Sequence, residues 1–305
     1  MRFTASRSVP ALLVSLFVLV TAALYAAPGV SATRSPRKAQ PTGEQANCPN
    51  HAQPPAPVDT SEEPAAGATR PEPLPVPSQA VGGTRMGECG LIRPGDAQDP
   101  PTVTAASWVI SDLDTGAVLA GKDPHARERP ASLIKALLAV VVIRELRQDM
   151  VVVGTTEDAN QEGTRVGIGP GGQYTVHQLL LALVMHSGND AAHALAGALG
   201  GVPATLDKMN ALAKELGALD TRAATPSGLD GPGMTTSAYD LSVIFRAAMK
   251  HKEFADAAAT KQIDFPGFGT KPGLLAKPGK STCRVAAASA NSVCFMAARK
   301  ITLWS

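Results

Sequence analysis

Ser132 and Lys135 stand three residues apart at the start of an apolar run that predicts a helix over 131–146. At this spacing a hydroxyl and an amine lie on one helical face, within reach of each other. The helix N-terminus favours negative charge on the serine oxygen, and a partly buried lysine loses its proton readily enough to act as a base. A capping serine with a surface lysine is the bland alternative, but the apolar neighbours of Lys135 leave it no solvated face. The pair predicts a nucleophile and its general base.

A second polar group, Ser187-Gly188-Asn189, follows 55 residues after Ser132 and separates two predicted helices. Serine, glycine and asparagine all favour turns, so a simple helix-breaking turn is the alternative interpretation. In combination with Ser132 and Lys135, the group matches a pairing of motifs found in serine enzymes that form an acyl-enzyme. We therefore add Ser187 and Asn189 to the candidate site.

The elements that position these residues follow from the pattern along the chain. Two strand-like runs around Asp114-Thr115-Gly116 predict a hairpin near the start of the folded part. Helices are then expected after Pro130 and over 176–185, where Thr175 can cap the N-terminus. Further helices are expected over 190–199, 204–216 and 237–251. Strands followed by a run of helices predict an α+β fold, with helices clustered against an antiparallel sheet.

The region before the hairpin has two different compositions. Residues 1–32 resemble a secretory signal: two arginines, an apolar run and a small-residue cleavage site at Val30-Ser31-Ala32. An uncleaved membrane anchor is the alternative, and it is the one membrane contact we expect. Residues 33–104 are rich in proline, which predicts a semi-rigid spacer or a plain disordered leader. Export would permit a disulfide between Cys48 and Cys89.

Overall composition narrows the classes of protein further. The chain has 305 residues, a formal net charge of +2 and 44% hydrophobic residues. These values exclude a collagen-like chain, a polytopic membrane protein and a disulfide-dense mini-protein. They also offer no electrostatic basis for binding nucleic acid. The oligomeric state has no signature in the sequence.

Four segments together resemble the successive signatures of the D-alanyl-D-alanine carboxypeptidases, which are low-molecular-weight penicillin-binding proteins. They are PASLIK at 130–135, MHSGNDAA at 185–192, TPSGLD at 225–230 and TSAYDL at 236–241. The resemblance covers 105–273 and implies a penicillin-binding-protein or β-lactamase-like transpeptidase domain in an exported, extracytoplasmic protein. Its implied ligands are peptidoglycan stem peptides and β-lactams, and it implies no metal or organic cofactor.

The resemblance also implies a role for each candidate residue. Ser132 would be the acylated nucleophile, and its backbone N–H would supply part of the oxyanion hole. Lys135 would be the general base. Ser187 would pass a proton to the departing D-alanine, and Asn189 would hold the substrate amide.

The C-terminal part departs from the family pattern. The family's third motif, Lys-Thr-Gly or Lys-Ser-Gly on a strand facing the nucleophile, does not occur in the chain. Lys271-Pro272-Gly273 and Lys277-Pro278-Gly279 have proline where a hydroxyl is needed, and Lys280-Ser281-Thr282 lacks the glycine. Residues 274–305 hold five Lys or Arg and no Asp or Glu. This atypical basic tail suggests a frameshift, with the family's C-terminal strands missing.

Other functions remain as alternatives. The main one is a catalytically impaired, truncated relative that only binds cell-wall peptides. A class A β-lactamase needs a glutamate that the 225–228 segment does not offer, and a Ser-His-Asp hydrolase needs a Gly-x-Ser-x-Gly elbow that is absent. His186 and His193 have no evident third partner, which argues against zinc.

Overall fold

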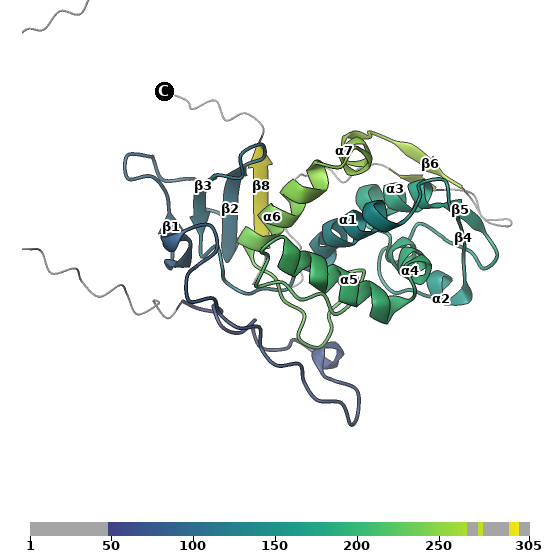
Figure 1. Cartoon of the computed structure of the whole chain (residues 1–305), viewed down its shortest axis with the longest axis horizontal. Coiled ribbons are helices and arrows are strands. Elements are labelled where there is room, and N and C mark those ends of the chain that lie inside the picture. Colours follow the sequence, from purple (N-terminus) through teal and green to yellow (C-terminus); the bar gives the residue numbers. More distant parts are fainter. Residues whose placement is uncertain (1–47, 267–273, 277–292, 299–305) are drawn as a thin grey trace, which may run out of the picture. The chain divides into compact units, whose positions relative to one another are not determined.

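The computed structural model describes residues 48–266, 274–276 and 293–298. Figure 1 shows a small sheet on one side and a group of helices on the other, with helix α6 (Ala238–Met249) between the sheet and the remaining helices. The other helices are α1 (Lys135–Glu145), α2 (Thr156–Ala159), α3 (Val176–His186), α4 (Asn189–Ala198), α5 (Val202–Glu215) and α7 (Lys252–Ala259). Three 3-10 turns are η1 (Thr60–Glu62), η2 (Thr84–Gly87) and η3 (Ala131–Ile134).

The main sheet has the strand order β1-β3-β2-β8. Strands β2 (Ser107–Asp112) and β3 (Val118–Lys122) pair antiparallel, with Trp108 opposite Lys122, so the predicted hairpin is confirmed. Strand β1 (Leu91–Ile92) extends the antiparallel part at the outer side of β3. Strand β8 (Val293–Ala298) runs parallel to β2, with Ser107 opposite Val293.

The expected antiparallel sheet is thus confirmed for β1, β3 and β2 and is wrong at β8. The sequence pattern missed β8 because it lies in the basic tail, 274–305, which we set apart from the domain on composition alone. A strand paired with a partner almost two hundred residues away has no local signal. Helix α6 packs against both β2 and β8.

The predicted helices are confirmed to within a few residues at their ends. Thr175 caps α3 with a reciprocal capping box: its hydroxyl accepts from the Gln178 N–H, and the Gln178 side chain accepts from the Thr175 N–H. The segment 131–146, expected to be one helix, begins instead as η3 and continues as α1. Helices α1 and α3 to α7 share one core, whose largest fully buried members include Leu137, Leu138, Leu179, Leu180, Leu183, Leu195 and Met209.

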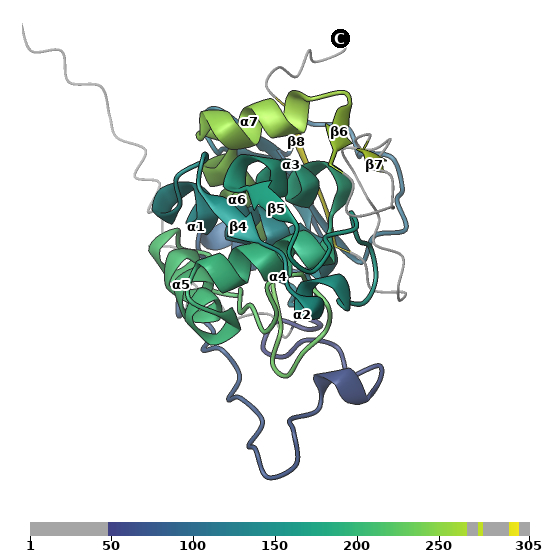
Figure 2. The same cartoon turned by 90° about the vertical axis from the view of Figure 1, so that its right-hand side faces the viewer.

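Two short β-ribbons complete the fold on the side of the helices away from the main sheet (Figure 2). Strands β4 (Val151–Val153) and β5 (Gln173–Thr175) pair antiparallel, as do β6 (Ile263–Phe265) and β7 (Leu274–Ala276). Tyr174 on β5 stacks on Phe265 on β6, with ring centroids 5.4 Å apart. None of the helices in the described part of the chain has the length and apolar character that a bilayer span requires.

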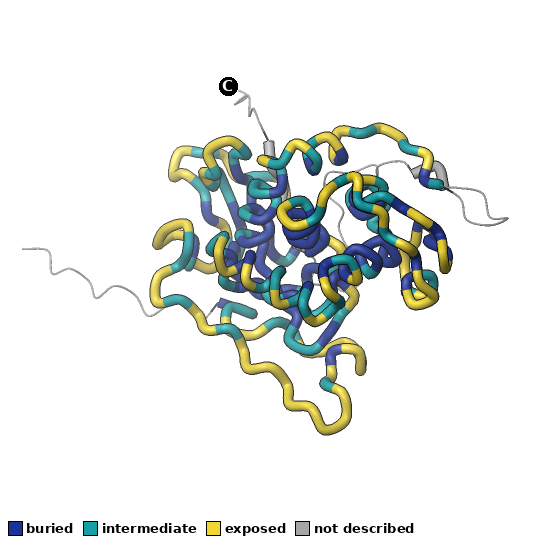
Figure 3. The backbone as a smooth tube through the Cα atoms, turned by 45° about the vertical axis from the view of Figure 1, so that its right-hand side comes forward, coloured by how far each residue is buried: buried dark blue, intermediate teal, exposed yellow. Residues whose placement is uncertain are grey.

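The proline-rich region differs from the spacer expected. Residues 48–92, which we call the strap, belong to the same compact unit as the helices and sheet. A disulfide joins Cys48 to Cys89 near its two ends, as the sequence suggested, and β1 at its end enters the sheet. Figure 3 shows most of the strap exposed, and its buried positions include Cys48, Glu62, Met86 and Ile92. Hydrogen bonds to neighbouring side chains of the domain hold the extended parts.

Candidate active site

Ser132 is presented to solvent by a strained turn. Pro130 is buried and precedes η3, and Ala131 adopts a left-handed φ of 47°. Non-glycine residues seldom take this conformation, which persists where the surroundings enforce it. Ser132 itself is exposed, whereas Ile134 and Lys135 two and three positions later are buried. The turn therefore places the hydroxyl at the surface and the amine beneath it.

Lys135 lies at the centre of a small polar cluster inside an otherwise apolar helix. Its Nζ lies 3.1 Å from Ser132 Oγ, 2.7 Å from Asn189 Oδ1 and 2.5 Å from the Ser227 carbonyl oxygen. The side chain is nearly fully buried. This burial lowers the pKa of Lys135 to about 7, even though the nearby Asp190 carboxylate acts in the opposite direction.

The three partners fit a neutral amine. A neutral Lys135 has two N–H donors, which match the amide oxygen of Asn189 and the carbonyl of Ser227. Its lone pair then remains for the Ser132 hydroxyl. With a pKa of about 7, a substantial share of the lysine is in this form at neutral pH. The arrangement can therefore take the proton from a serine nucleophile.

Ser187, Gly188 and Asn189 join α3 to α4 beside Lys135. Ser187 ends α3 in a left-handed conformation with φ 61° and is half-buried. Its backbone N–H is bonded to the Ala182 carbonyl. Among the described residues, no hydrogen bond joins the Ser187 hydroxyl to Ser132 or Lys135. The backbone of the turn nevertheless places Ser187 two residues before the Asn189 side chain that contacts Lys135.

Asn189 is held at both ends of its side-chain amide. Oδ1 accepts from Lys135, and Nδ2 donates to the Glu162 carbonyl at 2.7 Å. The residue is buried, and its backbone N–H donates to the Thr164 carbonyl. Sequence reasoning expected Asn189 to hold the substrate amide. The observed contacts add a second task, which is to orient the Lys135 amine.

Asp190 positions the loop beside this cluster and was not identified as a site residue from the sequence. Its carboxylate accepts from the backbone N–H groups of Val166, Gly167 and Ile168, at 2.8–3.1 Å. The charge of Asp190 also acts on Lys135. Its place directly after the Ser-Gly-Asn turn was the available signal, but an aspartate in the first turn of a helix is common for other reasons.

Gly228 brings the 225–230 segment against the nucleophile turn. A Cβ at this glycine would lie 2.0 Å from the Ala131 carbonyl oxygen and 3.0 Å from the Ser132 nitrogen. Only a residue without a side chain allows this approach, and its φ of 88° also favours glycine. The neighbouring Ser227 carbonyl can reach Lys135 as a result. The sequence pointed to this segment only through the resemblance and gave it no role.

The candidate third-motif segments, at 271–273, 277–279 and 280–282, lie outside the described residues. So does the signal segment, 1–32.

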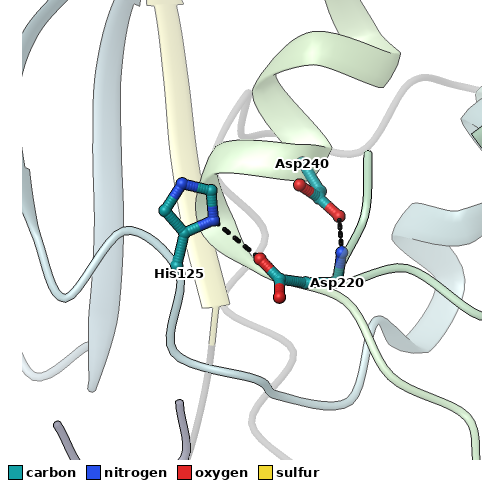
Figure 4. Close-up of side chains that lie close together, drawn as sticks. All are labelled: His125, Asp220 and Asp240. Carbon is teal, nitrogen blue, oxygen red and sulfur yellow. Dashed lines mark hydrogen bonds and ion pairs between the residues drawn. The ribbon is translucent and has the colours of Figure 1, made fainter. Parts of the chain in front are cut away.

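A second polar cluster, His125, Asp220 and Asp240, could be considered for a metal ion (Figure 4). Both ring nitrogens of His125 already face protein acceptors, the Asp220 carboxylate at 2.7 Å and the Val81 carbonyl at 3.0 Å. Asp220 also accepts from the Arg127 guanidinium at 3.1 Å. A cation would compete with the His125 ring and the Arg127 guanidinium for the Asp220 carboxylate, so the cluster fits a hydrogen-bonded anchor better than a metal centre.

Comparison with known proteins agrees with this geometry. Residues 95–268 match the Peptidase_S11 family, described as D-alanyl-D-alanine carboxypeptidase. The chain is 48% identical over 177 residues to the D-alanyl-D-alanine carboxypeptidase DacB2 of Mycobacterium tuberculosis, covering 57% of this chain and 61% of that protein. It is 36% identical over 184 residues to DacD of Salmonella typhimurium, covering 56% of this chain and 47% of that protein. The chain thus spans about half to three fifths of the length of these relatives.

Solved structures give the same result. The crystal structure of a D-alanyl-D-alanine carboxypeptidase from Mycobacterium tuberculosis superposes with a TM-score of 0.59 and 44% identity, covering 62% of this chain and 72% of that one. The expected penicillin-binding-protein type of α+β fold is confirmed. Since the family match extends over more than half of the chain and includes Ser132, Lys135, Ser187 and Asn189, the chain belongs to the D-alanyl-D-alanine carboxypeptidase family.

Proposed function

We propose that the chain is a serine-type D-Ala-D-Ala carboxypeptidase, which removes the terminal D-alanine from peptidoglycan stem peptides through an acyl-enzyme. The observation that carries the proposal is the contact between the buried Lys135 amine and the exposed Ser132 hydroxyl, 3.1 Å apart. Family membership supports the same reaction.

In this mechanism neutral Lys135 takes the proton of Ser132 while Oγ attacks the carbonyl carbon of the penultimate D-alanine. The Ser132 backbone N–H lies in the first turn of η3, where helix N–H groups lack intrahelical acceptors, and it would donate to the oxyanion. Asn189 Oδ1 and the Ser227 carbonyl hold the amine in place throughout.

The second half of the reaction returns the protons. The tetrahedral intermediate collapses as the C–N bond breaks, and Ser187 donates a proton to the nitrogen of the departing D-alanine. Protonated Lys135 resupplies Ser187. Water then attacks the acyl-enzyme with Lys135 as base, releasing the shortened peptide and restoring the Ser132 hydroxyl. A β-lactam would acylate Ser132 by the same first step.

We further infer that the protein works outside the cytoplasm, in the cell envelope. The Cys48–Cys89 disulfide supports this location, because disulfides persist in oxidising compartments. The signal-like composition of residues 1–32 supports it independently.

A second candidate function is binding of cell-wall peptides without turnover. It is favoured by one observation: the chain contains no Lys-Thr-Gly or Lys-Ser-Gly tripeptide. Release of D-alanine from a synthetic stem peptide ending in D-Ala-D-Ala distinguishes the two. Carboxypeptidase function predicts release that S132A abolishes. Saturable peptide binding with no release above the S132A background would establish the second function instead.

A further inference from the structure

The strap contacts the five residues that lead into the nucleophile turn. Residues 125–129 run from a turn at 124–125 to Pro130, and the side chains of His125, Arg127 and Arg129, at alternate positions, all reach strap atoms. The Arg127 backbone N–H also donates to the Asn50 carbonyl at 2.7 Å. Ser132 follows three residues after this segment. Figure 1 shows the strap passing along the same side of the molecule as the loop after α5.

Arg127 is the centre of these contacts. Its side chain is completely buried, and its guanidinium donates to the Ala52 and Leu74 carbonyls, both at 2.6 Å, and to the Pro75 carbonyl at 3.1 Å. These acceptors come from two separate passes of the strap. The charge is balanced by Asp220, which accepts from Nε. A planar guanidinium can serve several acceptors at fixed angles, which the single ammonium of lysine cannot.

The composition of the strap explains why arginine does this. Proline has no backbone N–H, so a proline-rich segment cannot pair its carbonyls within itself as a helix or sheet does. Its carbonyls need donors from elsewhere. Arg129 likewise donates to the Ala56 carbonyl at 2.7 Å and pairs with the buried Glu62, and Arg222 donates to the Glu72 carbonyl at 2.8 Å.

The contacts matter for the site because the turn they lead into is strained. Ala131, between Pro130 and Ser132, has a φ of 47°, and such a conformation persists where neighbours fix it from more than one side. Gly228 lies so close to the Ala131 carbonyl that no side chain could be placed between them. Glu128 is held by paired backbone hydrogen bonds with Thr236, and the neighbouring Arg127 joins the backbone to the strap.

We propose that Arg127 is a positioning residue for Ser132. It depends for this role on its contacts with the strap, which the Cys48–Cys89 disulfide closes. Arg127 touches neither Ser132 nor Lys135. It acts by fixing residues 125–129, which set the entry of the chain into the strained turn. The Cys48–Cys89 bond keeps both ends of the strap in place, so that the two passes stay available to the guanidinium.

The test is R127K, which keeps the positive charge opposite Asp220 but removes the guanidinium N–H groups that donate to the strap carbonyls. R246K is the matched control, because Arg246 also donates to two backbone carbonyls, those of Leu113 and Asp114, but away from the strap. Two readings are taken: acylation by a fluorescent penicillin, separated into its maximal rate and its dissociation constant, and hydrogen exchange of the peptide spanning 128–134.

R127K is expected to lower the maximal acylation rate at least tenfold with the dissociation constant changed less than twofold. Exchange over 128–134 is expected to be at least tenfold faster, and R246K should change neither. If R127K does not fold, the double variant C48S/C89S, which keeps the arginine, is expected to change both readings in the same direction. The proposal would be overturned if the acylation rate and the exchange rate of R127K both stay within twofold of those of the unaltered chain. It would also be overturned if R246K changes both rates as much as R127K does.

The acylation reading rests on the proposed function, whereas the exchange reading does not. If the unaltered chain is never acylated, the proposed function fails, and the strap is judged by exchange alone.

Discussion

Replacing Gly228 by alanine tests how closely the 225–230 segment fixes the nucleophile turn. The added Cβ would lie 2.0 Å from the Ala131 carbonyl oxygen, whereas real Cβ atoms essentially never come closer than 3.0 Å to another heavy atom. The atoms it meets are backbone and cannot rotate away. The Ala131–Ser132 peptide, the 225–230 segment or both must therefore shift by about 1 Å in total.

Such a shift acts on the reacting atom itself, because Ser132 directly follows Ala131. Misplacing a catalytic group by ~1 Å costs about 100-fold in rate, equivalent to roughly 2.7 kcal/mol of activation free energy. The positive φ adds about 1–2 kcal/mol of strain to the folded state, apart from the collision. We expect acylation of G228A by a fluorescent penicillin to fall about 100-fold, with a protein that is still folded by circular dichroism.

G171A is the matched control, since Gly171 has a φ of 80° but nothing within 4 Å of an added Cβ. G171A introduces the backbone strain without the collision and should be acylated at the rate of the unaltered chain. If folded G228A acylates within threefold of G171A, the contact between Gly228 and the nucleophile turn does not position Ser132.

Three further predictions concern titration and the disulfide. Because burial lowers the pKa of Lys135 to about 7, the neutral fraction of this lysine rises from about 9% at pH 6 to about 91% at pH 8. The acylation rate should therefore rise about tenfold over this range and then level off. A rate that still increases tenfold per pH unit at pH 8 would contradict this. Burial and the Asp220 charge raise the pKa of Asp240 from 3.8 to about 7, so in that interval the folded chain keeps a proton that the unfolded chain has lost. The stability of the unaltered chain relative to D240N should therefore fall as the pH rises through this interval, and a constant Tm difference from pH 4 to pH 8 would refute it. The Cys48–Cys89 bond closes a sequence separation of 41 residues, so reducing it should lower the free energy of unfolding by up to about 4 kcal/mol. Denaturant titration with and without reductant measures this difference. An unchanged midpoint would show that the disulfide does not stabilise the fold.

Much of the helical part could be predicted because its signals are local. Thr175 before a repeat of leucines specified α3, and three-residue spacing placed Ser132 near Lys135. Both depend on contacts between residues close in sequence, which periodicity captures.

The remainder depends on contacts between distant segments. Lys135 meets the Ser227 carbonyl across 92 positions, and a backbone carbonyl leaves no mark in the sequence. The contact of Asn189 with Glu162 could not be inferred either, because it is again to a backbone carbonyl. The contacts of the strap could not be inferred for the same reason: its prolines indicate an extended chain, but the arginines that donate to it lie 52–150 positions away.

Intact-mass spectrometry after incubation with a penicillin tests the central claim most directly. If Ser132 and Lys135 form a working nucleophile and base, the purified chain will gain the mass of one opened β-lactam, and the S132A variant will gain none. A folded, soluble chain that shows no adduct, or an adduct that persists in S132A, would contradict the assignment of Ser132 as the nucleophile.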